Sequence, residues 1–115
     1  MPEDCIFCKI ANQEVSVPLV YQDHLLAAFR DINPMAPVHI LIVPKKHIPG
    51  VLELTDIDVE MLGKVFEIAG KLARQEGIAE SGFRIVVNSG PDTGQSVQHV
   101  HFHLLGGRQM AWPPG

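Results

Sequence analysis

Apolar residues recur along this chain at two spacings, and these spacings separate candidate helices from candidate strands. From Cys5 to Gln13, apolar side chains recur every three to four positions, which predicts a short helix. The same spacing over residues 56–76 predicts the one long helix, with Thr55 and Asp58 as a capping box and Gly77 as its stop. The apolar face of this helix is predicted to comprise Leu62, Val65, Phe66, Ala69, Leu72 and Ala73.

Five further segments are rich in β-branched, aromatic and other apolar residues, which is typical of strands. They are residues 15–21, 25–29, 38–43, 83–88 and 97–105. The polar turn at 22–23 joins the first two as a hairpin, and the two prolines in 33–37 predict a rigid turn. Five strands with one main helix indicate an α+β fold with a mostly antiparallel sheet. No linker or repeat interrupts the pattern, so residues 1–115 are predicted to form a single domain.

Composition and charge narrow the possible partners. Hydrophobic residues make up 46% of the chain and charged residues 19%, a balance typical of a folded globule. The formal net charge is −4, the wrong sign for binding a nucleic acid polymer, although a small anionic ligand remains compatible. No apolar run is long enough for a membrane span, and the first four residues lack the features of a secretory signal. We therefore expect a cytoplasmic protein without a membrane partner.

The most informative segment is the last predicted strand. His99, His101 and His103 alternate with large apolar residues, so in a strand they share one face. Three neighbouring imidazoles disfavour each other's protonation, and at least one is expected to be neutral and nucleophilic near pH 7. The alternatives are a row of surface histidines and a three-histidine metal site. The metal alternative is weaker because one straight strand spreads three side chains too far apart for a single ion.

A loop directly before the histidines carries two glycines and could present backbone N–H groups to an anion. It runs from Asn88 to Ser96 and contains Gly90 and Gly94. Phosphate donors beside a nucleophile are what electrostatic stabilisation of a phosphoryl transition state requires. Together, the loop and the strand indicate phosphoryl transfer.

These residues resemble a known family. The segment His99-Val100-His101-Phe102-His103-Leu104-Leu105 matches the signature of the histidine-triad (HIT) family. The flanking segments 94–97, 106–110 and 112–115 look like its Hint branch of nucleotide-binding proteins, as do 29–32, 36–39 and 43–48. The resemblance implies the HIT fold and a homodimer whose sheets join. It also implies a purine nucleotide-binding hydrolase that releases a nucleoside monophosphate, typically AMP, from a phosphoramidate.

By this resemblance, His101 is the nucleophile that becomes transiently nucleotidylated. His103 contacts the phosphate and assists protonation of the leaving amine, and His39 completes a proton relay. Without the resemblance, His39 would be interpreted as a core histidine after a proline turn. A binding module that senses nucleotides, and a dinucleoside polyphosphate hydrolase, remain alternative functions.

The resemblance also assigns a nucleotide site. Asn88, the backbone at Gly94 and Gln95, and Ser96 align with the phosphate-binding part, and Asp31 aligns with the residue that accepts hydrogen bonds from the ribose hydroxyls. The apolar slot for the base aligns with Ile6, Phe7, Ile10, Phe29 and Ile32. Taken singly, these apolar residues would be assigned to the core.

Cys5 and Cys8 form a Cys-x-x-Cys pair that occurs in only part of the Hint branch. In that metal-bearing subset the matching further ligands are His47 and His99, which implies a closed, structural zinc site. Such a site would leave His101 and His103 for chemistry. Two buried cysteines acting as small hydrophobes, or a redox disulfide, are the alternatives.

The C-terminal segment 106–115 lacks apolar periodicity, yet it carries Met110 and Trp112, the single tryptophan of the chain. An aromatic side chain in such a tail is expected to be buried. By resemblance it lies against the partner chain of a homodimer, beside the partner's substrate pocket. A tail folded back on its own sheet is the alternative.

Overall fold

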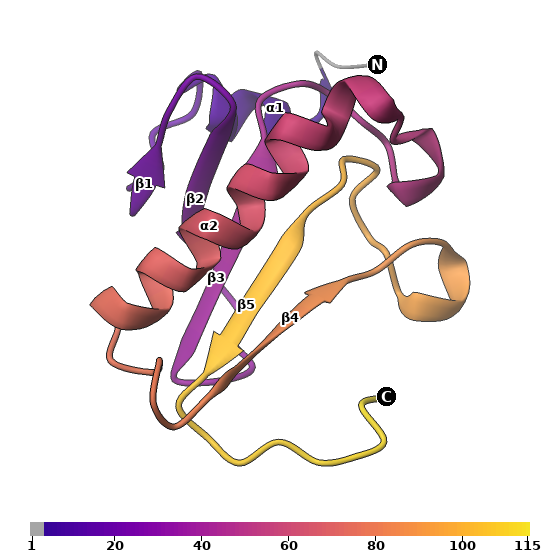
Figure 1. Cartoon of the computed structure of the whole chain (residues 1–115). Helices are drawn as coiled ribbons and strands as arrows, with labels where there is room; N and C mark the ends of the chain where they lie inside the picture. The colour runs from indigo at the N-terminus through magenta and orange to yellow at the C-terminus, as the bar shows by residue number, and fades with distance from the viewer. Residues whose placement is uncertain (1–3) are drawn as a thin grey trace.

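Five strands form one sheet in the order β1-β2-β3-β5-β4, with every neighbouring pair antiparallel (Figure 1). The computed structural model describes residues 4–115. The strands are β1 (Tyr21–Gln22), β2 (Leu26–Arg30), β3 (Val38–Pro44), β4 (Phe83–Val87) and β5 (Phe102–Gly106). The predicted α+β fold with a five-stranded antiparallel sheet is therefore confirmed.

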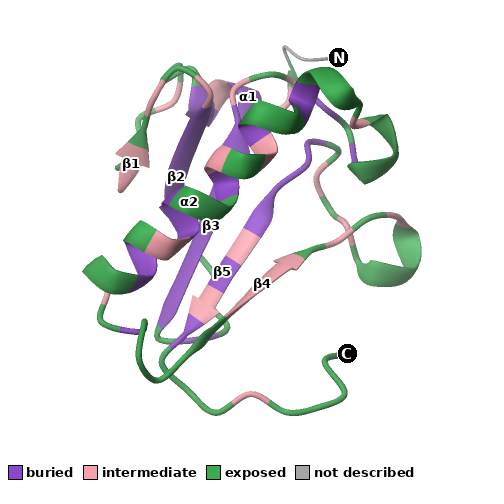
Figure 2. Cartoon of the chain, in the orientation of Figure 1, coloured by how far each residue is buried: buried purple, intermediate pink, exposed green. Residues whose placement is uncertain are grey.

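Two α-helices cover opposite faces of this sheet. The long helix α2 (Val59–Gln75) packs on the face that carries Leu26 and Ile40, and the short helix α1 (Ile6–Ala11) packs on the face that carries Phe29 and Leu41. Because side chains alternate along a strand, β2 and β3 supply apolar residues to both cores. The whole of β3 is buried as a result (Figure 2).

Helix α2 begins as its sequence indicates. Thr55 and Asp58 form the capping box, which leads through a 3₁₀ turn (Asp56–Asp58) into the helix, and Gly77 follows the helix with φ of 77°. One member of the predicted apolar face lies elsewhere, since the side chain of Phe66 is 56% exposed while Met61 and Ile68 are buried.

The predicted strand over 15–21 is reduced to a single residue, Tyr21, at the start of β1. The N–H of Val17 donates to the carbonyl of Val15, and Pro18 has no N–H to donate. The backbone there is therefore committed to a turn and cannot form a ladder. Two further 3₁₀ turns, Val51–Glu53 and Pro91–Thr93, connect the remaining elements.

The predicted strand over 97–105 also begins late, at Phe102, so two of the three histidines precede it. Val100 N–H donates to the carbonyl of Ile48, and the carbonyl of His99 accepts a bond from the ring of His101. These backbone groups are therefore not free to pair with β3, and the equal spacing of three histidines along one straight strand is wrong.

No helix within residues 4–115 is long and apolar enough to cross a membrane. The cytoplasmic location stays a prediction. The prediction that the first four residues are not a secretory signal concerns residues 1–3, which lie outside the described part of the chain.

Candidate active site and metal cluster

His101 is held by the backbone of the segment that leads into β5. Its Nδ1 lies 2.7 Å from the carbonyl oxygen of His99. A carbonyl only accepts, so Nδ1 carries the proton, and the Nε2 of the neutral ring keeps its lone pair. Phe7 packs edge-on against this ring with centroids 4.9 Å apart. The sequence segment thus presents an oriented imidazole with a free nucleophilic nitrogen.

His39 and His103 form a second, linked pair. The backbone N–H of Met35 donates to Nδ1 of His39 at 3.0 Å, so the proton of neutral His39 is on Nε2. That Nε2 lies 2.9 Å from Nδ1 of His103, which must then accept. The proton of His103 is therefore on its own Nε2, a buried atom without a hydrogen-bond partner in the described residues. An unpaired buried donor is costly, and a ligand oxygen or nitrogen would satisfy it.

Burial keeps this pair neutral in the free protein. Burial first, and then the neighbouring His101 and His39, lower the pKa of His103 to about 4. Burial also lowers the pKa of His39, although Asp31, whose Oδ2 lies 3.5 Å from Nε2 of His39, acts in the opposite direction. Near pH 7, His103 is thus a neutral hydrogen-bond donor.

A pocket of about 350 Å³ opens beside these rings. Its lining includes nine of the predicted nucleotide-site residues: Ile6, Phe7, Ile10, Phe29, Asp31, Ile32, Ser96, His101 and His103. It is mainly apolar where α1 meets β2, and Ile32, 91% exposed, stands at its rim. Val17, Arg30, Leu41 and Val97 also line it, and sequence reasoning did not single these four out.

Three other predicted residues lie outside this lining. The side chain of Gln95 accepts from Gly90 N–H and donates to the carbonyls of Pro49 and Val97, so it braces the loop. Gly94 has φ of 78° at the end of the Pro91–Thr93 turn, a conformation that favours glycine. Asn88 is the third residue outside the lining. The role of Asn88, Gly94 and Gln95 in binding phosphate stays a prediction.

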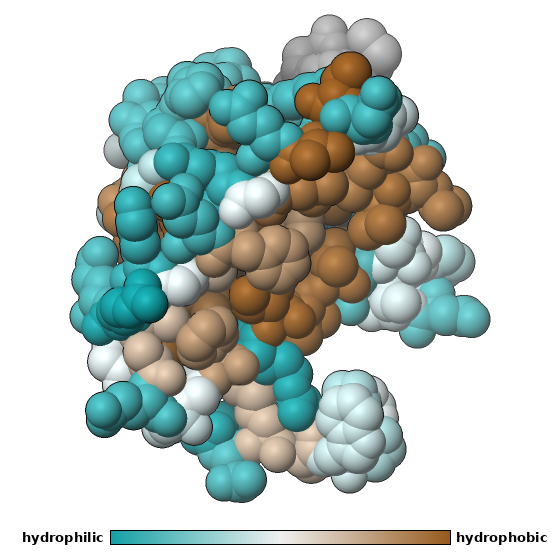
Figure 3. Space-filling view, in the orientation of Figure 1, coloured by the Kyte–Doolittle hydropathy of each residue, from teal (hydrophilic) through white to brown (hydrophobic). Residues whose placement is uncertain are grey.

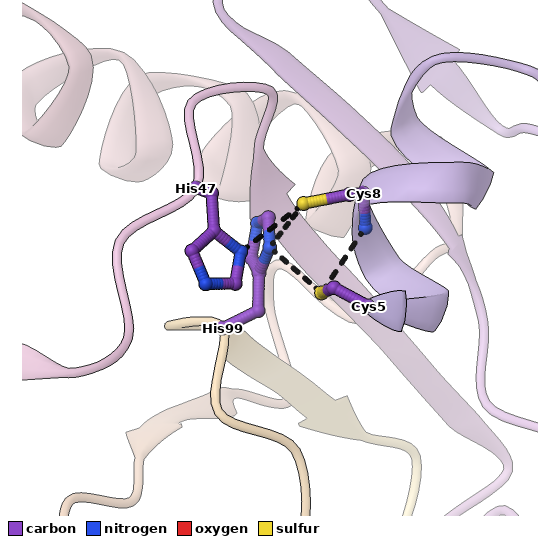
Figure 4. Close-up of side chains that lie close together, drawn as sticks. All are labelled: Cys5, Cys8, His47 and His99. Atoms are coloured by element: carbon purple, nitrogen blue, oxygen red, sulfur yellow. Dashed lines mark hydrogen bonds between the residues drawn. The ribbon is translucent and has the colours of Figure 1, made fainter. Parts of the chain in front are cut away.

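A separate cluster joins α1 to the opposite end of β3 from the His39–His103 pair. Cys5, Cys8, His47 and His99 point toward one another, with all four ligand atoms within 4.8 Å (Figure 4). His99 is wholly buried, and its Nε2 donates to the carbonyl of Pro44 at 2.8 Å. That bond leaves Nδ1 of His99 as a lone pair directed at the two sulfurs, the outer-shell arrangement usual for metal-binding histidines.

The spacing of the donor atoms suits a tetrahedral ion. The Nδ1 atom of His99 lies 3.3 Å from Sγ of Cys5 and 3.4 Å from Sγ of Cys8, and Nδ1 of His47 lies 3.1 Å from Sγ of Cys8. Zn–S bonds of about 2.3 Å and Zn–N bonds of about 2.0 Å would separate S and N by roughly 3.5 Å. These three distances lie within a few tenths of an ångström of that value, and the four residues form a candidate metal site.

The two cysteines do not have the surroundings of a reactive redox pair. Both are free thiols, and burial together with Cys5 raises the pKa of Cys8 to about 11. Reactive cysteines are instead activated by a lowered pKa. The chemistry of the cluster therefore favours metal binding over the disulfide alternative.

The fold and the site define a class of small α+β domains in which the start of a sheet strand carries an oriented imidazole beside an apolar pocket. Within that class, the sequence matches the HIT domain family over residues 12–110. The chain belongs to the HIT domain family.

Two named relatives are similar to this chain over nearly its whole length. The purine nucleoside phosphoramidase of Escherichia coli is 48% identical over 96% of this chain and 92% of its own length. The 14 kDa zinc-binding protein of Zea mays is 50% identical over 96% of this chain and 87% of its own. A crystal structure of a HIT family hydrolase from Legionella pneumophila superposes with a TM-score of 0.93 at 51% identity, covering 96% of this chain and 99% of that one.

Proposed function

We propose that this chain hydrolyses the P–N bond of nucleoside 5′-phosphoramidates and releases a nucleoside monophosphate through a nucleotidylated His101. The single observation that carries the proposal is the pair of complementary nitrogens at the pocket: a lone pair on Nε2 of His101 and an unpaired N–H on Nε2 of His103. The similarity to a purine nucleoside phosphoramidase supports the choice of bond.

In the first step, Nε2 of His101 attacks the α-phosphorus, the P–N bond breaks, and the amine leaves with a proton. The bond from Nδ1 to the carbonyl of His99 stabilises the positive charge that develops on the attacking ring. In the second step, water attacks the phosphorus and releases a proton, the phosphorus–His101 bond breaks, and Nε2 of His101 regains its lone pair. Each step is easier than direct attack by water, which is the usual benefit of covalent catalysis.

His103 is proposed to supply the donor for the phosphoryl group and the leaving amine. Its neutral ring offers an N–H to the phosphoryl oxygen. An anionic phosphoryl group beside this buried ring raises its pKa, so the complex can take up a proton that the free enzyme does not hold. His103 then delivers the proton on its Nε2 to the departing nitrogen, while His39 lies against its Nδ1.

The nucleoside is proposed to lie in the apolar part of the pocket. A flat purine would lie against the apolar side chains of α1 and Phe29, where Phe7 contacts Phe29 edge-on with ring centroids 5.6 Å apart. One carboxylate oxygen of Asp31 accepts from Asn33 N–H, and the partly exposed group has further lone pairs for a ribose diol. Ser96 lies at the same pocket and supplies a hydroxyl for the phosphate.

We further propose that Cys5, Cys8, His47 and His99 bind zinc in a structural role. Two sulfurs and two imidazoles at tetrahedral spacing support this ion, as does the similarity to a zinc-binding protein. Bound there, zinc would cross-link α1 to the sheet. Its ligand set is closed, so it takes no part in the reaction steps above.

The chain is proposed to be a single domain that works as a homodimer. Apolar side chains gather on the face that carries α2, beside β4 (Figure 3). The exposed large apolar residues of these two elements are Val59 and Phe66 on α2 and Phe83 and Val87 on β4. Trp112 is 81% exposed, so the tail does not bury its indole on its own sheet. A second copy of the chain would cover both features.

The test is incubation with an adenosine 5′-phosphoramidate, with mass spectrometry of both products and protein. Wild type should release AMP and carry one AMP on His101 when the reaction is quenched early. His101→Ala should lose activity by roughly 10³-fold or more while its affinity for AMP stays within a few-fold. His24→Ala, a matched change at an exposed histidine outside the pocket, should behave as wild type.

Three results would contradict the proposal. His101→Ala activity within a few-fold of wild type would exclude the nucleophile. Wild type that binds AMP but turns over no phosphoramidate would favour a nucleotide-sensing module, and turnover of dinucleoside polyphosphates alone would favour the phosphoanhydride hydrolase.

A further inference from the structure

Arg108 lies outside the pocket lining, yet it is connected to the proton-carrying histidines through one residue. It follows β5 by two positions, and its Nε donates to the carbonyl oxygen of Met35 at 2.8 Å. Its Nη1 donates to the carbonyl of Gln109 at 3.1 Å. The two bonds fix the guanidinium between the start of the C-terminal tail and the turn that precedes β3.

The backbone around Gly107 brings these two segments together. Gly107 has φ of 93°, and a Cβ placed on it would lie 3.0 Å from Cβ of Pro37. Only a glycine fits both the conformation and the close approach without strain. The chain therefore turns directly beneath the 33–37 turn, which puts Arg108 within reach of Met35.

Met35 has both of its backbone groups in use. Its carbonyl accepts from Arg108, while its N–H donates to Nδ1 of His39. The second bond is the one that assigns the proton of His39 to Nε2 and so makes that atom the donor to His103. If the Met35 N–H moved away, Nδ1 of His39 would lose its partner, and the other tautomer would cost less.

We propose that Arg108 is a positioning residue: it holds the backbone at Met35, whose carbonyl and N–H lie in successive peptide groups, so that His39 keeps its proton on Nε2 and His103 keeps its N–H directed at the reacting phosphoryl group. The inference rests on the proposed function for the role of His103. Its geometric part, the effect of Arg108 on the His39 tautomer, is independent of any activity.

The choice of arginine follows from the two simultaneous bonds. A guanidinium donates from Nε and Nη1 in fixed directions, so binding to Gln109 orients the Nε–H toward Met35. A lysine offers a single flexible ammonium, which can reach one carbonyl without fixing its direction. Arg108→Lys should therefore restore the effect only in part.

The experiment compares wild type with Arg108→Met, Arg108→Lys and Arg74→Met, a control that removes a charge from the exposed end of α2. Nitrogen-15 NMR of histidine-labelled, nucleotide-free protein reports which ring nitrogen of His39 carries the proton. We expect one tautomer in wild type and Arg74→Met, a mixture in Arg108→Met, and an intermediate state in Arg108→Lys.

Kinetics on an adenosine phosphoramidate provide the second readout. In Arg108→Met, kcat should fall about 2- to 10-fold, the range that one net hydrogen bond produces in an equilibrium. The KM should stay within about two-fold, because the pocket lining is untouched. Across wild type and the two Arg108 variants, kcat should fall in the same order as the fraction of His39 that carries its proton on Nε2.

An unchanged His39 tautomer in Arg108→Met would overturn the inference, as would a fall in kcat equal in Arg108→Met and Arg108→Lys. A general loss of folding, seen as a lower melting temperature with all histidine signals altered alike, would also overturn it. If wild type proved to have no phosphoramidase activity, the proposed function would fail while the tautomer measurement would still decide the role of Arg108.

Discussion

Removal of the metal should weaken nucleotide binding far more than it slows the chemistry, because α1 serves both sites. The helix carries Cys8, and Cys5 caps its start, while three of its other side chains line the pocket: Ile6, Phe7 and Ile10. His101 and His103 belong to the β5 segment instead. The perturbation is Cys5→Ser with Cys8→Ser, or zinc chelation in the wild type.

The expected size follows from how little holds α1 in place without the ion. Ordering its six residues costs about 6–12 kcal/mol of backbone entropy. Burying Phe7 and Ile10 returns about 3–6 kcal/mol, and the bonds from Lys9 N–H to Cys5 and from Asn12 N–H to Cys8 return about 1 kcal/mol each. The summed return of about 5–8 kcal/mol reaches only the lower part of the cost, so the helix should be docked only part of the time.

If α1 is docked for roughly 10–30% of the time, the apparent Kd for AMP rises roughly 3- to 10-fold, since affinity scales with the competent fraction. Because His99 keeps its bond to Pro44, its carbonyl still orients His101, and kcat should change less than about three-fold. The assays are titration calorimetry with AMP, hydrogen exchange over residues 5–12, and steady-state kinetics.

Lys9→Ala is the matched control, since Lys9 lies on α1 but outside both the pocket lining and the metal cluster. It should leave the metal content and the Kd unchanged. Metal-free protein that binds AMP as tightly as the metal-bound form would refute the reasoning. So would protection of residues 5–12 that does not change when the metal leaves.

Two further predictions concern pH and the tail. Burial lowers the pKa of His103 to about 4, whereas in the unfolded chain it is near 6.5, so the unfolded state takes up the proton first as pH falls. In wild type, the free energy of unfolding should decrease as the pH falls from 6.5 to about 4, and in His103→Asn it should decrease less steeply. Denaturant titrations measure both slopes against pH, and equal slopes would contradict this prediction. Wild type should sediment as a dimer at micromolar concentration, and Trp112→Ala should change the preference for the leaving amine. A monomer, or an unchanged preference, would argue against a tail that lies beside the partner's substrate pocket.

The elements with strong local signals were predictable from the sequence. The capping box at Thr55 and the stop at Gly77 act within a few residues, and both occur as expected. The strand over 15–21 failed because its β-branched composition does not reveal that Val17 bonds backward to Val15. The exposure of Phe66 also had no local signal, since the apolar period of a helix does not show which of its apolar side chains the sheet covers.

The site was predictable in its members and not in its connections. The pocket gathers nine of the expected residues, most of which the family resemblance supplied. The contact between His39 and His103 depends on the register in which His39 pairs with Leu105, and a sequence does not state strand register. Arg108 had no signal at all, because its partner is a backbone carbonyl 73 residues earlier.

The three alternating histidines acquire different chemistry because one nitrogen of each ring is already engaged, and in a different way from ring to ring. Nε2 of His99 donates to the carbonyl of Pro44, which leaves Nδ1 for the metal cluster. Nδ1 of His101 donates to the carbonyl of His99, which leaves the lone pair of Nε2 at the pocket. Nδ1 of His103 accepts from His39, which leaves an N–H on Nε2. A straight strand would give three equivalent rings on one face, so the late start of β5 at Phe102 is what allows one repeated residue to present a lone pair on Nδ1, a lone pair on Nε2 and an N–H on Nε2.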